Sequence, residues 1–264
     1  MQMIVEQLSV RDIAYLCLAP PKPMKRSSSV GTMPIWFPTQ SPGVMIICFS
    51  ANASLLAGIA LLATGIITVR RADRLVQLPY AAIPVAFGMQ QLVEGYLWKA
   101  LPTQSQTTEI VATIYLSFSH VLWPIFVPLA VVMIEPLKTR RKRLLVPMAA
   151  GAVAGLYFLY ALLTQPVSAL IEGHHIVYHL PHRHDAFILT LYIMGTCLTP
   201  LLSSYKTIRL FGIVIVIGLI VTRMVYMHWF ASVWCFFAAL MSALVLLHFS
   251  QQRARDNQTY SRRL

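Results

Sequence analysis

The stretch Gln90-Gln91-Leu92-Val93-Glu94-Gly95-Tyr96-Leu97-Trp98 places one carboxylate and two amides inside a segment otherwise apolar enough to lie in lipid. An ionisable side chain in hydrocarbon costs roughly 2.5–3.5 kcal/mol, so it normally faces the interior of a helix bundle and has a partner there. On a helix, Gln90, Glu94 and Trp98 recur every four residues and share a face, which Gln91 flanks. This stretch therefore predicts a membrane-spanning helix and supplies the first candidate site.

The whole chain has the composition of a polytopic membrane protein. Of its 264 residues, 57% are hydrophobic and only 11% are charged, and the mean hydropathy is +0.66. A soluble domain carries about 25% charged residues. The net charge of +12 does not indicate a nucleic-acid partner, because the Lys and Arg residues form short clusters between apolar runs.

Seven apolar runs follow Met45, and each is near the roughly 20 residues that a spanning helix needs. Their approximate spans are 49–69, 78–100, 109–134, 144–164, 185–203, 209–226 and 228–249. We therefore predict an all-α fold, a bundle of seven transmembrane helices over residues 45–250, with the lipid bilayer as its main partner.

Positive charge is distributed unequally between the connections. Fourteen Lys and Arg residues follow the first, third, fifth and seventh runs, whereas three follow the other runs. Loops that stay in the cytoplasm retain positive charge. The asymmetry predicts a multi-pass protein of the bacterial inner membrane with its N-terminus outside and its C-terminus inside, and a basic cytoplasmic tail over 251–264.

Residues 1–44 are unlike the rest of the chain. They contain six prolines and the polar run Ser27-Ser28-Ser29, and no apolar run long enough for a signal peptide. We expect a disordered tail. Because four basic residues in this tail oppose its export, a second hypothesis is that the natural chain begins at Met45 and that 1–44 is a start-site extension.

The third apolar run contains His120, Trp123 and Pro124. Pro124 has no N–H, so the carbonyl of His120 loses its helical partner. At 1.5 Å per residue, the depths of Glu94 and His120 differ by roughly 8 Å, so the two side chains could bind a proton, a cation or a metal together. The alternative is a hydrogen bond between helices, with Glu94 protonated.

Arg223, near the outer end of the sixth run, has two interpretations. It either extends to the outer headgroups, where Tyr226, His228 and Trp229 resemble an interfacial belt, or lies inside the bundle as a counter-ion for Glu94.

The connection 165–185 holds five of the eight histidines within 174–184. Imidazole suits zinc, so His174, His175 and His179 are candidate ligands, and the last two would share a face if the segment were helical. Gly173, Pro181 and the run 176–178 instead favour an extended or irregular loop. A solvated loop that gains charge on acidification is the alternative to a zinc site.

Four stretches together resemble a known family. They are Cys48-Phe49-Ser50-Ala51-Asn52-Ala53-Ser54, Gln90-Gln91-Leu92-Val93-Glu94-Gly95, Ser119-His120-Val121-Leu122-Trp123-Pro124 and Ser232-Val233-Trp234-Cys235-Phe236-Phe237-Ala238-Ala239. The resemblance is to an uncharacterised bacterial family of integral membrane proteins that begin near a Met-Cys-Phe-Ser-Ala motif. It covers about 45–250 and implies no activity, because the family is a domain of unknown function.

The sequence supports three hypotheses about function and does not itself decide whether the protein is an enzyme. The leading one is a sensor or transporter-like protein that binds a small ligand, ion or lipid headgroup. Its polar cavity would open outward between the second, third and seventh helices. Gln90, Gln91, Glu94 and His120 would line it, with Trp98 and Trp123 as walls. The alternatives are a metal-dependent intramembrane hydrolase, in which zinc and Glu94 activate water, and a structural assembly partner. No phosphate loop, HExxH zinc motif or nucleophile elbow is present.

Overall fold

The computed structural model describes residues 51–103, 106–172, 175–180, 186–225 and 230–261. Each of the seven predicted runs corresponds to a helical segment, so the predicted bundle of seven helices is confirmed, while the all-α prediction missed a short β-hairpin. In order, the segments are α3 (Ala51–Arg70); α4 (Leu78–Ala81) with α5 (Ile83–Ala100); α6 (Gln106–Leu116), η3 (Ser117–Leu122) and α7 (Trp123–Ile134); α8 (Lys138–Thr164); α9 (Ala186–Ile193), η4 (Met194–Leu198) and α10 (Thr199–Leu201); α11 (Lys206–Val225); and α12 (Phe230–Ser261). Short 3-10 turns, η1 (Leu75–Gln77) and η2 (Leu101–Thr103), flank the second segment.

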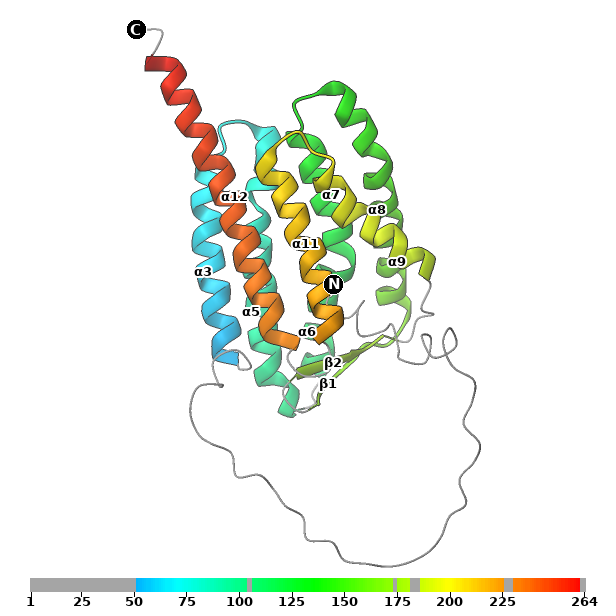
Figure 1. Ribbon diagram of the computed structural model, residues 1–264. Helices are drawn as coiled ribbons and strands as arrows, with labels where there is room; N and C mark the ends of the chain where they lie inside the picture. The colour runs from blue at the N-terminus through cyan, green and yellow to red at the C-terminus, as the bar shows by residue number, and fades with distance from the viewer. Residues whose placement is uncertain (1–50, 104–105, 173–174, 181–185, 226–229, 262–264) are drawn as a thin grey trace, which may run out of the picture.

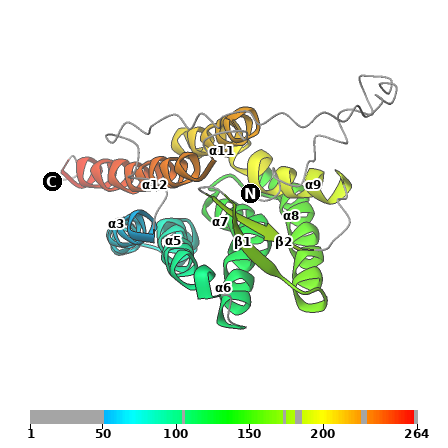
Figure 2. The same ribbon diagram turned by 90° about the horizontal axis from the view of Figure 1, so that it is seen from below.

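The long helices run side by side and form one bundle (Figure 1). Seen along the bundle, α12, α11 and α9 lie on one side and α3, α5, α7 and α8 on the other (Figure 2). Buried aromatic and aliphatic side chains from both rows form the core, among them Tyr80, Phe211 and Phe249.

Apolar side chains also cover the outside of the bundle. On α8 the buried positions Leu144, Ala154 and Phe158 follow helical spacing, whereas Val146 and Leu163 on the opposite face are 68% and 77% exposed. Among the described residues, three helices are long and apolar enough to cross a membrane, namely Ala51–Arg70, Thr107–Ile134 and Lys138–Thr164, and Ala186–Leu201 is a shorter apolar helix.

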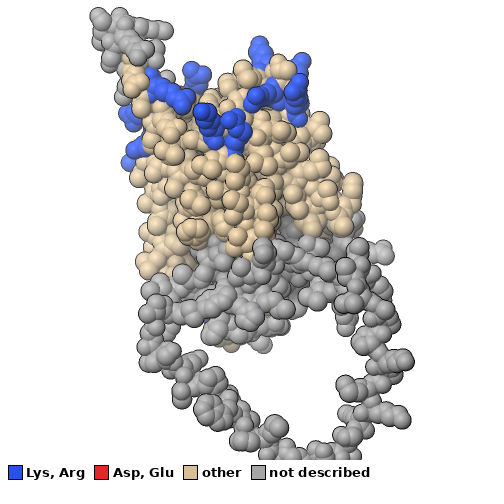
Figure 3. Space-filling model, in the orientation of Figure 1, with Lys and Arg blue, Asp and Glu red and all other residues tan. Residues whose placement is uncertain are grey.

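Lys and Arg gather at one end of the bundle, and the middle of the visible face lacks them (Figure 3). This end, called the basic end below, carries the end of α3, the start of α8, the start of α11 and the last turns of α12. The predicted tail 1–44 lies outside the described residues. The predicted tail from 251 is a continuation of α12, which runs to Ser261.

The opposite end of the bundle is covered by a β-hairpin. Strands β1 (Ser168–Glu172) and β2 (His175–His179) pair antiparallel, with Ala169 opposite Tyr178. Tyr178 stacks on Tyr115 of α6, with ring centroids 4.9 Å apart. The sequence predicted an extended or irregular loop here, and the β-branched and aromatic run 176–178 explains why the extended form is a paired strand.

Close backbone contact brings the third, fourth and fifth segments together. A Cβ added at Gly151 of α8 would collide with the carbonyl oxygen of Pro124, and one added at Gly195 of η4 would lie 2.5 Å from the Cα of Gly151. Only glycine fits at such an approach. The contact joins the third and fifth segments, whose turns η3 and η4 are wider π-helical turns.

Candidate functional site

The predicted polar face of α5 is buried in the bundle. Gln90 and Gln91 are each 2% exposed and Glu94 is 5% exposed, whereas Trp98 is half-buried. Glu94 Oε2 accepts a hydrogen bond from Gln91 Nε2 at 3.0 Å, one turn earlier on the same helix. No Lys or Arg side chain in the described part of the chain forms an ion pair with Glu94. The carboxyl group therefore has an amide partner and no described counter-ion.

His120 lies in a π-helical turn of the third segment. The turn covers Ser117–Leu122, and the N–H of Trp123 donates to the carbonyl of Phe118, five residues back. A second π-helical turn, Met194–Leu198, likewise precedes a proline, Pro200. The loss of the proline N–H was predicted from the sequence, but the widened turn that accommodates this loss was not.

The π-helical turn fixes His120 in the core, where it is fully buried. Its Nδ1 and Ser119 Oγ share a hydrogen bond of 2.8 Å, and Tyr192 donates its hydroxyl to the carbonyl of Ser119, also at 2.8 Å. The His120 ring packs edge-on against Phe158 at 4.9 Å. The backbone and ring of His120 are thus held by neighbouring segments.

A hydrogen bond connects the two halves of the candidate site. Trp123 Nε1 on α7 donates to Gln90 Oε1 on α5 at 2.7 Å, and the Trp123 ring packs on Phe87 at 4.3 Å. The structure therefore brings Gln90 and Trp123 together. Glu94 and His120 make no hydrogen bond with each other in the described residues, so that pairing stays a prediction.

A small apolar pocket lies beside Trp123. Its volume is about 20 Å³, which is room for about one water molecule. The lining residues are Phe87, Trp123, Val127, Tyr192, Thr196, Phe211, Ile215 and Met241. The first turns of α12 would also bound the predicted outward cavity, and their side chains are not among those that the structure describes. The cavity therefore stays a prediction. The side chain of Arg223 is likewise not described, so both interpretations of this residue stay predictions.

The candidate zinc ligands fall in the hairpin. His174 lies outside the described residues, and His175 and His179 are the first and last residues of β2. Four strand residues span roughly 13 Å along the axis, whereas residues four apart on a helix lie about 5–6 Å apart. The shared helical face considered for these two histidines is therefore absent in the strand. No group of three metal-ligating side chains occurs among those that the structure describes.

A second buried carboxylate, not singled out from the sequence, lies at the basic end. Glu135 follows α7 and is 4% exposed. It accepts hydrogen bonds from Ser203 Oγ at 3.0 Å, from Ser204 N at 2.9 Å and from the Ser204 hydroxyl, and a longer one from Leu137 N at 3.4 Å. Glu135 thus anchors the connection between α10 and α11. The sequence signal that could have identified Glu135 is a single acidic residue just before the basic run 138–143.

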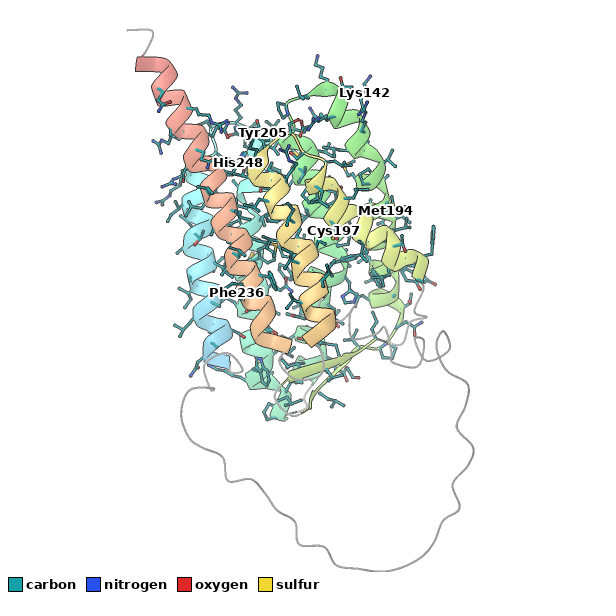
Figure 4. The ribbon with its side chains drawn as sticks, viewed as in Figure 1. Lys142, Met194, Cys197, Tyr205, Phe236 and His248 are labelled. Carbon is teal, nitrogen blue, oxygen red and sulfur yellow. The ribbon has the colours of Figure 1, made fainter. Side chains whose placement is uncertain are left out.

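The start of α11 meets α12 next to this anchor. Tyr205 and His248 lie close together (Figure 4), with ring centroids 4.8 Å apart, and His248 Nδ1 shares a hydrogen bond of 2.7 Å with Thr207 Oγ1. The pKa of Tyr205 is raised, first by burial and then by the nearby charge of Glu135. The charges of Arg74 and Arg255 lower it and offset part of this shift. Opposite charges therefore surround the start of α11.

The fold and the buried polar cluster define a helical-bundle protein with polar groups in its core. The chain belongs to the family of unknown function DUF6629, whose model matches residues 47–261. The resemblance to an uncharacterised family is thereby confirmed, while the bacterial origin and the N-terminal motif stay predictions. No curated protein and no solved structure matches the chain.

Proposed function

We propose that the protein is a multi-pass inner-membrane protein that binds a small cation or cationic ligand at Glu94, as a sensor or transporter-like protein. The membrane location is supported by the apolar outer faces of the bundle and by three helices of spanning length and composition. The collection of Lys and Arg at one end supports a cytoplasmic basic end (Figure 3). The N-terminus of α3 and the hairpin would then face the periplasm.

The carboxyl group of Glu94 carries the ligand-binding part of the proposal. No counter-ion for Glu94 lies among the described side chains, and a buried carboxylate without one is costly, so it is either protonated or available to a cation. Gln90 and Gln91 provide amide oxygens on the same buried face, and Trp98 and Trp123 provide apolar walls. His120 is expected to contribute from the facing helix.

Carbodiimide labelling tests this proposal directly. Dicyclohexylcarbodiimide, a hydrophobic reagent, adds to carboxyl groups in apolar surroundings. We expect one adduct on Glu94 of the purified protein, detected by peptide mass spectrometry, and slower labelling in sodium, potassium or choline chloride. Labelling that none of these cations slows would overturn the proposal. It would favour the structural assembly alternative, in which the polar groups serve packing.

Two matched controls accompany the labelling. Glu94→Gln should form no adduct at this position. Glu135 should remain unlabelled in the same sample, because its oxygens already accept hydrogen bonds from the α10–α11 connection.

The orientation has an independent test. A phosphatase reporter that is active only in the periplasm should be inactive when fused after Leu264, and activity there would contradict the proposed orientation.

Metal analysis of the purified protein tests the hydrolase alternative. Stoichiometric zinc that is lost on substitution of His175 and His179 would favour that enzyme.

A further inference from the structure

A second pocket, distant in the fold from Glu94, lies at the basic end between α8 and α11. Its volume is about 360 Å³, within the range of small-ligand sites. The lining residues are Arg140, Arg143, Leu144, Leu201, Leu202, Ser203 and Arg209. We call it the arginine pocket. Its lining combines three guanidinium groups with leucine side chains and contains no acidic residue.

Two arginines of this pocket, Arg140 and Arg209, are held close to each other by the backbone. Arg140 Nη1 donates to the carbonyl of Ser203 at 3.4 Å, and Arg209 Nη1 donates to the same carbonyl at 3.0 Å and to that of Ser204 at 3.2 Å. Arg143 lies one turn after Arg140, on the same face of α8. Holding like charges together is unfavourable unless an anion lies between them.

Glu135, the buried carboxylate of the basic end, does not line the arginine pocket. It accepts hydrogen bonds from the hydroxyls of Ser203 and Ser204 and from Ser204 N, and so stabilises the connection from which the pocket is built. With three guanidinium groups and no acidic residue in its lining, the arginine pocket has excess positive charge.

We propose that the arginine pocket binds the phosphate of an anionic lipid headgroup. Arginine presents parallel N–H donors that match phosphate oxygens. Leu202, in the pocket, is 45% exposed, and the neighbouring Leu145 and Leu210 are 45% and 44% exposed. These side chains offer an apolar surface on which acyl chains can lie while the headgroup contacts the arginines.

The choice of a lipid over a soluble phosphate rests on the proposed membrane orientation. In that orientation, the basic end lies at the cytoplasmic leaflet, whose anionic lipids attract clusters of Lys and Arg. The inference is otherwise independent of ligand binding at Glu94.

The test compares lipid-dependent stabilisation of detergent-purified variants. Phosphatidylglycerol should raise the thermal midpoint of the wild-type protein more than phosphatidylcholine does, and glycerol phosphate should have little effect. Arg143→Gln should weaken the apparent affinity for phosphatidylglycerol about tenfold, the loss expected for one charge-assisted contact. Arg143 is the suitable target because, unlike Arg140 and Arg209, it has no described bond to the connection.

Lys142 provides the matched control. It precedes Arg143 in the same basic run, is exposed near the tip of α8 (Figure 4) and does not line the pocket. Lys142→Gln should therefore keep the wild-type response. Arg143→Lys, which keeps the charge but loses the parallel donors, should give an intermediate affinity and serves as a second variant if Arg143→Gln fails to fold.

Three outcomes would overturn the inference. Equal weakening by Lys142→Gln and Arg143→Gln would mean diffuse surface attraction. Equal stabilisation by glycerol phosphate and by the lipid would assign the pocket to a soluble anion. No preference for phosphatidylglycerol in the wild-type protein would remove the site. Glu94→Gln should leave the lipid response unchanged, so failure at Glu94 and failure at the arginine pocket are distinguishable.

Discussion

Glu94 and Glu135 have nearly equal exposure but very different surroundings. Glu94 is 5% exposed and accepts a described hydrogen bond from Gln91 alone, whereas Glu135 is 4% exposed and accepts bonds from both Ser203 and Ser204. Burial by itself therefore does not identify a functional acid. The number and type of hydrogen-bond donors around the carboxyl group separate a residue that fastens two segments from one that is available to a ligand.

The largest expected effect is the loss of the Glu135 anchor. Glu135→Ala should lower the free energy of unfolding by roughly 3 kcal/mol, because it leaves the buried donors of Ser203 and Ser204 without an acceptor. Thermal unfolding of the detergent-purified protein measures this change. Glu109→Ala, at an exposed acid of α6, is the control and should be near neutral. Equal midpoints for the two variants would mean that Glu135 is not an anchor.

A smaller loss is expected at the bond between α5 and α7. Trp123→Phe should cost about 2 kcal/mol, because Gln90 Oε1 then lacks its donor and the space beside the ring grows. The same unfolding assay measures it. Phe87, which packs on this ring without a hydrogen bond, gives a comparison: Phe87→Leu should cost stability but keep the bond from Trp123 to Gln90, detected as slow hydrogen exchange of the indole N–H. An unchanged stability of Trp123→Phe would show that the bond contributes little.

Removing one donor from the Glu135 anchor should cost less again. Ser204→Ala deletes the hydroxyl donor but keeps the backbone N–H of residue 204, so about 1 kcal/mol of stability should be lost. A double-mutant cycle with Glu135→Ala tests whether the two residues act together. If the separate effects simply add, the hydroxyl and the carboxylate are not coupled.

The smallest change in stability is expected at Glu94. Glu94→Gln keeps the shape of the side chain and an oxygen that can accept from Gln91, so the free energy of unfolding should shift by less than about 0.5 kcal/mol. Carbodiimide labelling and its protection by cations should nevertheless be abolished. Destabilisation as large as that of Glu135→Ala would instead make Glu94 a second structural anchor.

Apolar runs were sufficient to predict the helical architecture, because a helix lets a long apolar segment satisfy its backbone N–H and C=O groups within itself. The apolar runs underestimated the length of the helices that continue into charged sequence. The run predicted at 144–164 belongs to a helix that begins at Lys138, and the last helix runs to Ser261. Lys and Arg are good helix formers, so the end of an apolar run is not the end of its helix.

The candidate site was only partly predictable. The helical spacing of Gln90 and Glu94 predicted their shared buried face, because that spacing is a local property. The bonds from Trp123 to Gln90 and from Ser203 to Glu135 join residues 33 and 68 positions apart. Hydropathy carries no information about such partners. The β-hairpin was missed for a related reason, since its contact with α6, the stacking of Tyr178 on Tyr115, joins residues far apart in the sequence.

The π-helical turn at Ser117–Leu122 has a consequence for how the third segment is oriented. Such a turn contains one residue more than an ordinary α-helical turn. Deleting a single residue there would let the helix close to its regular form with α6 and α7 nearly in their present relation, whereas winding the same residues as a regular α-helix would rotate α6 by roughly 100° about its axis relative to α7. The wide turn thus sets the rotation of α6 about its axis relative to α7, and with it the direction in which the imidazole of His120 points.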